Sequence, residues 1–570
     1  MTNYLHIVSS QYKHLPGRDF SAVEGHIIAR GSMMKNEPFS FQALYRCDGG
    51  ASFVPVSISA VCEGLPIEAW RVDSVPLLSA YNPRKEPGYV SDAPGAYPDL
   101  LTPRPVNPEV VRIRTAWSST LFEKDTDALL NAMPGEYQSV WFTVNPDSET
   151  LTAGSYAIVV KLHNLSSDEV IEQTLALDVI DAALPEHDAY YTNWFYEDCI
   201  CDMFGVALYS DEFYAIFDEY IKNMTRHRQN VLLLPAFTPP LDTPVGAERM
   251  NVQLTDIERD GDGWRFGFER MRRFVRHAKA GGIRYFEHCH LFSQWGARNA
   301  PNIYNAAGER IFGFDTDAAG EEYVGFIRAY LTAFFAFAKE EGIEDSLIFH
   351  ISDEPSEAQL ESYRAAHDSV ADLLCGHPTA DAMSSVKFYE EGLVTQPIPF
   401  IPHADEFEKS CDRFWLYYTG SAHERCTNRL ISNTCARTRV LGVQMYRYKA
   451  LGFLQWAYNF YYDRLSAGTT DPRSNPGGYK QMPGVTFLAY PIPGGAKQHV
   501  LPSIREKMMA EAFDDLRALK LLESCIGRDA VMALCTEHLG EVSWQTIPKD
   551  EALRELREAV NAKIAENIKK

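Results

Sequence analysis

The first third of the chain alternates apolar and polar residues, as β-strands do. The clearest example is the run Ser-Tyr-Ala-Ile-Val-Val-Lys-Leu-His at residues 155–163. Further strands are predicted at residues 26–29, 39–45, 53–60, 110–115, 139–144 and 173–180. The span 81–108 holds seven prolines and is predicted to be an ordered loop packed on a neighbour. Short strands between Pro- and Gly-rich turns predict an N-terminal β-sandwich over residues 1–185.

From residue 186 the pattern changes to short apolar runs that alternate with segments of helical period. The runs predict strands at residues 189–195, 230–235, 283–288, 347–352, 379–383, 399–402, 414–419 and 453–459. Helices are predicted at residues 211–227, 266–281, 320–341, 357–375, 432–450 and 502–523, and the connections after the fifth and sixth strands are reduced to short turns. Eight strands of this kind predict a (β/α)8 TIM barrel.

The predicted fold is therefore multidomain, with an all-β and an α/β part. A β-sandwich domain at residues 1–185 precedes a (β/α)8 barrel catalytic domain at residues 186–525. A short helical C-terminal tail occupies residues 526–570.

Composition limits the partners of such a protein. The net charge of −23 argues against a nucleic acid or an anionic membrane, because no basic patch is present to meet phosphate groups. No segment has the length and apolar character of a membrane span. Eleven scattered cysteines and an opening stretch without an apolar signal core predict reduced thiols and a cytoplasmic location. Whether the chain forms a homo-oligomer is left open.

The candidate chemistry is concentrated at the end of the fourth strand of the α/β part. There a buried apolar run ends in two adjacent acids, Asp353 and Glu354, followed by Pro355. Two carboxyl groups this close raise the pKa of one partner, so one can be protonated beside one that is ionised. Glycosidic bond cleavage uses such a pair. The alternative is that Asp353 merely caps the helix that follows.

The ends of the other predicted strands carry aromatic rings and polar side chains. Rings stack on the apolar faces of sugars, and amide, carboxylate and imidazole groups bind sugar hydroxyls. In a barrel these strand ends would meet on one face. With His350 from the fourth strand, the predicted substrate-binding residues are Asn193, Trp194, Asp198, His288, Trp295, Tyr417, Trp456 and Asn459.

A metal site is the competing chemistry. His288-Cys289-His290 has a ligand spacing known from metalloenzymes, but no later set of His and Asp completes it convincingly. The glycine pairs lie outside a strand–glycine–helix context, which argues against nucleotide binding. We therefore expect neither a metal nor another cofactor.

The acid pair lies in a longer motif, His350-Ile-Ser-Asp353-Glu354-Pro355. It resembles the His-x-x-Asp-Glu-Pro signature of glycoside hydrolase family 123 and of its relatives in domain-of-unknown-function family 4091. Further resemblances follow in order along the chain up to about Cys525, at Asn36-Glu37, Tyr97-Pro98-Asp99, Asn193-Trp194-Phe195, Thr238-Pro239-Pro240, residues 452–456 and Ser503-Ile504-Arg505.

The resemblance implies a retaining exo-β-N-acetylhexosaminidase, typically for N-acetylgalactosamine, that acts on an oligosaccharide or glycoside with assistance from the substrate's acetamido group. By the same resemblance, Asp353 would orient the 2-acetamido group and Glu354 would be the general acid and then the general base. Two alternatives stay open: an exo-glycosidase for a sugar without a 2-acetamido group, and a non-catalytic carbohydrate-binding protein.

Overall fold

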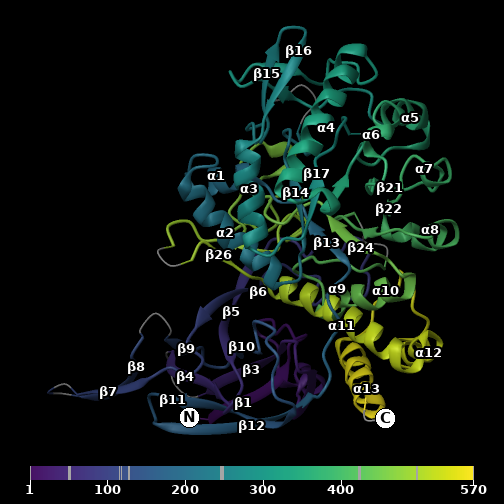
Figure 1. Ribbon diagram of the computed structural model, residues 1–570. Helices are drawn as coiled ribbons and strands as arrows, with labels where there is room; N and C mark the ends of the chain where they lie inside the picture. Colours follow the sequence, from purple (N-terminus) through teal and green to yellow (C-terminus); the bar gives the residue numbers. More distant parts are fainter. Residues whose placement is uncertain are drawn as a thin grey trace.

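The computed structural model describes residues 2–48, 53–114, 116, 118–125, 129–239, 241–243, 249–294, 296–421, 425–495 and 498–568. Figure 1 shows a region of long strands in the N-terminal part, drawn in purple and blue, below a region of short strands and helices drawn in teal and green. The C-terminal helices, drawn in yellow, lie beside both. A mostly β N-terminal region thus precedes an α/β region that ends in helices.

Two five-stranded sheets form the N-terminal region. The first has the order β1-β3-β10-β5-β6 and the second β2-β12-β11-β4-β9. Their bounds are β1 Thr2–Ser9, β2 Arg30–Met34, β3 Phe39–Asp48, β4 Val54–Val61, β5 Ile67–Leu77, β6 Gly95–Arg104, β9 Leu130–Ala132, β10 Gln138–Val144, β11 Gly154–Asn164 and β12 Glu169–Ile180. Buried residues of both sheets, such as Phe41 and Phe142 opposite Ile158 and Leu177, share one core. A separate hairpin joins β7 Val110–Arg114 to β8 Ser119–Glu123.

Most of the strands predicted for this region are present, with two corrections. The predicted strand at residues 26–29 is wrong, because Glu24–His26 is a 3-10 turn and the strand begins only at Arg30. The predicted loop at 81–108 does pack on a neighbour, since Val90 N donates to Ser432 O at 2.8 Å, but it contains strand β6. Thr115, at the end of another predicted strand, lies outside the described residues.

Each of the eight strand predictions in the α/β region overlaps an observed strand, and the observed strands are generally shorter. The strands are β13 Tyr190–Asn193, β14 Val231–Leu234, β17 Tyr285–His288, β20 Leu347–Phe349, β21 Ala382–Met383, β22 Ile398–Pro399, β23 Leu416–Tyr417 and β24 Gly452–Gln455. Of these, β22 shares only Pro399 with its predicted range of 399–402. The connections between these strands contain three antiparallel pairs of short strands. They are β15 Asp256–Asp260 with β16 Gly263–Gly267, β18 Ile303–Tyr304 with β19 Arg310–Phe312, and β25 Tyr490–Pro491 with β26 Val500–Leu501.

These eight strands pair in parallel, in three pieces. The pieces are β14-β17-β20, β21-β22 and β13-β24-β23, and single parallel bridges at Phe349–Thr379 and Phe400–Tyr417 lie between them. Within the described residues no ladder joins β13 to β14, where Tyr191 N instead donates to the Asn230 side chain at 2.9 Å. The sheet topology therefore does not confirm a closed eight-stranded barrel, which stays a prediction.

All six predicted helices are present, and two of them are divided. The observed helices are α1 Glu197–Phe204, α2 Asp211–Arg226, α3 Glu269–Ala280, α4 Glu321–Glu341, α5 Leu360–Asp368, α6 Ala371–Leu374, α7 Lys387–Glu390, α8 Ala404–Ser410, α9 Cys435–Arg439, α10 Leu441–Tyr448, α11 Ile504–Ile526, α12 Arg528–Leu539 and α13 Asp550–Ile568. The short α7 and α8 follow the fifth and sixth strands, as predicted. In the part of the chain that is described, no helix has both the length and the hydropathy of a membrane span.

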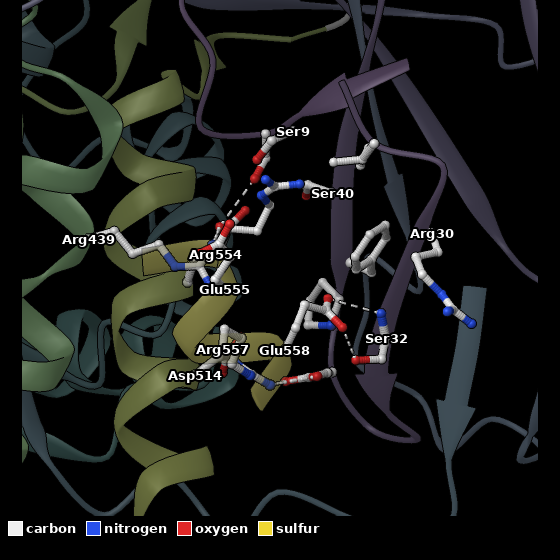
Figure 2. A pocket seen from close by; sticks show the side chains of 16 residues that line it. Ser9, Arg30, Ser32, Ser40, Arg439, Asp514, Arg554, Glu555, Arg557 and Glu558 are labelled. Carbon is white, nitrogen blue, oxygen red and sulfur yellow. Dashed lines mark hydrogen bonds and ion pairs between the residues drawn. The ribbon is translucent and has the colours of Figure 1, made fainter. Parts of the chain in front are cut away.

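Buried ionic contacts join the N-terminal sheets to the rest of the chain. Arg505 of α11 donates to Asp99 of β6 at 3.0 Å, and both side chains are almost fully buried. Arg557 of α13 donates to Glu37 at 2.6 Å. A hollow of about 420 Å³ lies between these parts. In Figure 2, Glu558 of α13 points to Ser32 of β2. Removing one partner of such a buried pair leaves an uncompensated charge.

These contacts lead to a first prediction. Residues 186–570 expressed alone should be insoluble or inactive, because Arg505 and Arg557 lose buried carboxylate partners and apolar surface is exposed. The solubility of the fragment is measured by its soluble yield and by size-exclusion chromatography, and its activity by glycosidase assays. The full chain, expressed in parallel, is the reference. A soluble fragment with full activity would contradict the prediction and show that the N-terminal sheets are dispensable.

Candidate active site

The acid pair lies just beyond the end of β20, on a segment with an unusual backbone. Strand pairing stops at Phe349, and Glu354 adopts a left-handed conformation with φ +43°. A non-glycine residue rarely takes this conformation unless its surroundings hold it. Here Glu354 N donates to Ala382 O at 3.0 Å, at strand β21. The segment therefore turns sharply, with Asp353 half-buried and Glu354 exposed.

Both acids line a pocket of about 450 Å³. Its lining also includes Trp194 after β13, Ala382 in β21, Tyr417 in β23 and Leu454 in β24. Loops complete the wall with Leu241, Asp242, Thr243, Gln294, Thr419, Gly420, Ser421, Trp456, Arg464, Leu465, Tyr479, Lys480, Met482 and Val485. Rings and a few convergent polar groups in a concave site of this size suit a small, partly apolar ligand such as a sugar.

The two carboxyl groups have different partners. Gln294 Nε2 donates to Asp353 Oδ2 at 2.9 Å, and Tyr417 OH donates to Glu354 Oε1 at 2.7 Å. Burial and the neighbouring Glu354 carboxylate raise the pKa of Asp353 to about 7. Below that pH the free protein therefore holds a proton at Asp353, whereas the resemblance-based assignment requires the proton on Glu354.

The structure brings three of the predicted substrate-binding residues to the acid pair. Trp194, Tyr417 and Trp456 line the pocket. The rings of Trp456 and Tyr479 lie 5.5 Å apart and form one aromatic wall. His350 lies below the pocket, where its ring meets the edge of Trp194 at 5.8 Å. Trp295 lies outside the described residues.

Four other predicted substrate-binding residues do not line the pocket. Asn193 binds Gln229 and Arg429, and Asp198 pairs with Arg249 at 3.0 Å. The Asn459 side chain holds the Tyr196 main chain at 2.9 and 3.0 Å, and His288 contacts Tyr330 OH at 2.8 Å. All four are buried, because polar side chains at strand ends can turn into the interior when buried partners satisfy them.

Sequence reasoning missed the loop residues of the site. Gln294, Asp242 and Tyr479 come from three separate connections, and nothing in the local sequence brings them together. Gln294 carried the best available signal, since it follows the third predicted strand. Asp242 accepts from Tyr479 OH at 3.0 Å and from Leu465 N at 2.7 Å.

Among the described residues, His290, His350 and Asp381 have potential metal-ligating atoms within 4.8 Å of one another. Both His350 nitrogens already face carboxylates, Glu287 Oε1 and Asp381 Oδ1, each at 3.3 Å. Burial lowers the pKa of His350, but these two hydrogen bonds outweigh it and raise the pKa to about 10. With both ring nitrogens already facing carboxyl groups, the geometry favours an ion-paired cluster.

The place of Trp456 in the wall gives a second prediction. Trp456→Ala should weaken sugar binding by about 10- to 30-fold, which corresponds to roughly 1.5–2 kcal/mol of lost ring contact. The melting temperature should change little. Titration calorimetry with the sugar and thermal unfolding measure both, and Trp264→Ala, at a half-buried ring packed on Phe326, is the matched control. A loss of about 3–5 kcal/mol in the free energy of unfolding would instead mark the Trp456 ring as structural.

The raised pKa of Asp353 gives a third prediction. Between its ordinary value of 3.8 and about 7, the folded protein keeps a proton that the unfolded chain releases, so this carboxyl group lowers stability as pH rises through that window. Asp353→Asn should therefore raise the melting temperature relative to wild type more at pH 8 than at pH 4. The control Asp372→Asn should have a similar effect at both pH values, because its hydrogen bond to Arg328 lowers the pKa of Asp372 and both pH values lie above its ordinary value of 3.8. A pH-independent effect of Asp353→Asn would contradict the prediction.

A ring-lined pocket with adjacent carboxyl groups after a parallel strand defines a class of protein, the glycoside hydrolases. Residues 194–522, more than half of the chain, match the family model for the glycoside hydrolase 123 catalytic domain. The chain belongs to glycoside hydrolase family 123, as its motifs suggested.

A solved structure with a TM-score above 0.5 shares the fold over the whole chain. The chain is similar to a family 123 glycoside hydrolase from Clostridium perfringens whose description concerns glycolipid glycan hydrolysis, with a TM-score of 0.71, 12% identity, and 100% of this chain and 98% of that chain covered. It is far less similar to a β-glucuronidase from Parabacteroides merdae (TM-score 0.28, 11% identity, 75% and 46% covered). Its similarity to an endo-β-1,4-mannanase from Thermotoga petrophila is also low, with a TM-score of 0.35, 12% identity, and 59% of this chain and 78% of that chain covered. A search of the curated proteins returns no match.

Proposed function

We propose that this glycoside hydrolase is exo-acting and retaining, and that it removes a terminal β-linked N-acetylhexosamine, with N-acetylgalactosamine as the first candidate. One observation carries the proposal: two adjacent carboxyl groups, Asp353 and Glu354, face one pocket and are held by different partners. The relative from Clostridium perfringens, described in terms of glycolipid glycans, makes a glycolipid headgroup a reasonable natural substrate to test.

In the proposed first step, the oxygen of the 2-acetamido group attacks the anomeric carbon and the glycosidic bond breaks. Glu354 gives its proton to the leaving oxygen, and ionised Asp353 accepts a hydrogen bond from the acetamido N–H while positive charge grows on that nitrogen. In the second step Glu354 takes a proton from water, whose oxygen attacks the anomeric carbon and reopens the oxazolinium ring. Two inversions give retention.

The proton must shift when the substrate binds. In the free protein burial and the neighbouring Glu354 raise the pKa of Asp353 to about 7, so Asp353 holds a proton below that pH. An acetamido N–H that donates to Asp353 favours its ionised form, so the proton moves to Glu354, where the leaving oxygen needs it. Binding of the acetamido group, whose oxygen is the nucleophile, would thus give Asp353 and Glu354 the protonation states that the first step requires.

The hydrogen bonds of Asp242, the third acid in the pocket lining, support catalysis by the substrate's acetamido group over catalysis by a carboxylate nucleophile. Among the described lining residues the only other acid is Asp242, and its oxygens accept hydrogen bonds from Tyr479 OH and Leu465 N. Asp353 and Glu354, being consecutive, are poorly placed to flank a sugar ring from opposite faces. The acetamido group of the substrate is the remaining nucleophile.

The fold proposed for this chemistry is a distorted (β/α)8 barrel over residues 186–525, between a sandwich at 1–185 and a tail at 526–570. Seven of the eight neighbouring strand contacts that a barrel requires are parallel ladders or bridges, counted as β14-β17, β17-β20, β20-β21, β21-β22, β22-β23, β23-β24 and β24-β13. The pocket lies beyond the C-terminal ends of these strands, where barrel enzymes hold their active sites.

A panel of 4-nitrophenyl β-glycosides tests the function. We expect hydrolysis of the N-acetylgalactosaminide or N-acetylglucosaminide, and the galactoside is the matched control because it lacks only the acetamido group. Proton NMR should show the β-anomer as the first product, and a thiazoline analogue of the oxazolinium ion should inhibit. Equal turnover of the galactoside would contradict substrate assistance, and binding without any turnover would favour a carbohydrate-binding protein.

A further inference from the structure

The proposed mechanism leaves unused a buried charged cluster directly behind the acid pair. It comprises Glu287 of β17, His350 after β20 and Asp381 before β21, each with a side chain that is 0 to 1% exposed. Thr192 Oγ1 of β13 donates to Glu287 Oε2 at 2.7 Å, so the contacts of the cluster extend from β13 to the start of β21. Buried charges are costly to assemble, which makes a cluster of three worth explaining.

Asp381 has the most unusual position of the three. Its carboxylate accepts from the main-chain nitrogens of Ile351 at 3.0 Å and Ser352 at 3.1 Å. It also accepts from Tyr363 OH at 2.5 Å and from His350 Nδ1 at 3.3 Å. The nitrogen of Ile351 would pair with the next strand if the ladder of β20 continued, because Phe349 N, two residues earlier, donates to Pro378 O on that side. The carboxylate thus replaces the ladder at the point where the chain turns toward Asp353.

The same segment is held from its other side. Leu291 N donates to His350 O at 2.9 Å and Phe292 N to Ile351 O at 3.1 Å. Ser352 Oγ donates to Ser293 O at 2.7 Å. One residue beyond Asp381, Ala382 O accepts from Glu354 N. Contacts on both sides can hold the left-handed backbone of Glu354, which an isolated turn would not favour.

We propose that Asp381, supported by His350 and Tyr363, is a positioning residue that fixes the segment 350–354 so that the Asp353 and Glu354 carboxyl groups face the sugar. The inference rests on the proposed function only in assigning catalysis to this pair, and it does not depend on which sugar is cleaved. His350 lies between the carboxyl groups of Asp381 and Glu287, at 3.3 Å from each, and its ring compensates the charge buried there.

The test compares Asp381→Asn and Tyr363→Phe with a matched control. An asparagine keeps the shape but turns one acceptor into a donor, facing the Ser352 N–H or the Tyr363 O–H. We expect Asp381→Asn to lower kcat by roughly 10²-fold, the effect of misplacing catalytic groups by about 1 Å. The KM and the affinity for the sugar product should change little, because the aromatic walls remain. Tyr363→Phe should likewise lower kcat and leave the KM and the product affinity nearly unchanged, with a smaller loss of kcat than Asp381→Asn.

The control is Glu506→Gln. Glu506 is also a buried carboxylate that accepts from a tyrosine, Tyr458 OH at 2.7 Å, and from Asn223, but it lies outside the pocket lining. It should lose stability while kcat stays near the wild-type value. Crystal structures of the Asp381 and Tyr363 variants should show displaced Asp353 and Glu354 carboxyl groups.

Three results would overturn the proposal. The first is a folded Asp381→Asn or Tyr363→Phe protein with wild-type kcat and an unshifted Glu354. The second is a kcat loss in Glu506→Gln equal to that in Asp381→Asn, which would reduce the effect to stability. The third is stoichiometric metal in the purified protein that Asp381→Asn removes, which would make the cluster a metal site. Failure of the proposed function is distinguishable, because it would appear as wild-type activity in Glu354→Gln.

Discussion

Glu354→Gln should lower hydrolysis of a natural oligosaccharide by roughly 10²- to 10⁴-fold, the usual contribution of general acid–base catalysis. The proton from Glu354 matters in proportion to how poorly the leaving oxygen bears negative charge. With a nitrophenyl glycoside the phenolate leaves without a proton, so the variant should keep much more of its glycosylation rate. Steady-state and burst kinetics on the two substrates measure this difference.

A variant at Tyr417 provides the control for this experiment. Tyr417 OH donates to Glu354 Oε1 at 2.7 Å, so Tyr417→Phe removes one hydrogen bond and keeps the carboxyl group. Its loss should be smaller than that of Glu354→Gln and should show the same dependence on the leaving group. A Glu354→Gln enzyme that cleaves both substrates at the wild-type rate would exclude Glu354 from the mechanism, and the helix-capping alternative for the pair would gain support.

The strands of the α/β region were predictable because apolar runs mark them, but their ends were not. The fourth strand was predicted to reach Ser352, whereas pairing stops at Phe349. Beyond Phe349 the main chain is held by the Asp381 carboxylate and by residues 291–293. Only the tertiary fold supplies these partners, so a local pattern of apolar residues cannot locate the end of the strand.

The missed strand β6 has a different cause. Pro98 and Pro103 suggested a loop, since proline cannot donate to a ladder. In the structure β6 is the edge strand of the order β1-β3-β10-β5-β6, where a missing donor is tolerated. The identity of an edge strand follows from the order of the whole sheet, which a single strand's sequence does not contain.

Among the predicted substrate-binding residues, large rings line the candidate pocket and smaller polar side chains do not. Tyr417 and Trp456 lie in the pocket, whereas Asn193 and Asn459 turn inward to buried polar partners that sequence could not reveal. Glu287 and Asp381 could have been noticed, because each is an acid inside a predicted apolar strand. A buried acid in such a strand requires a partner, and the pattern therefore indicated a charged cluster without locating it.

Asp353→Asn should differ from Glu354→Gln. It removes the negative charge that supports the growing positive charge on the acetamido nitrogen, whatever the leaving group. We expect a loss of roughly 10²- to 10³-fold, or about 2.7–4 kcal/mol, on the oligosaccharide and the nitrophenyl glycoside alike. A galactoside turned over slowly by the wild-type enzyme would be a useful control, because it has no acetamido group for Asp353 to bind and should lose less.

The pH dependence provides an independent test of the same assignment. In the wild type, burial and Glu354 raise the pKa of Asp353 to about 7, so Asp353 holds a proton below that pH. The alkaline fall of kcat/KM should therefore begin near pH 7, as the pair loses this proton. Repulsion between two carboxylates delays that loss, and Asp353→Asn removes the repulsion, so the fall should move to lower pH. Equal losses for both variants on both substrates, with an unshifted pH profile, would contradict separate roles for Asp353 and Glu354.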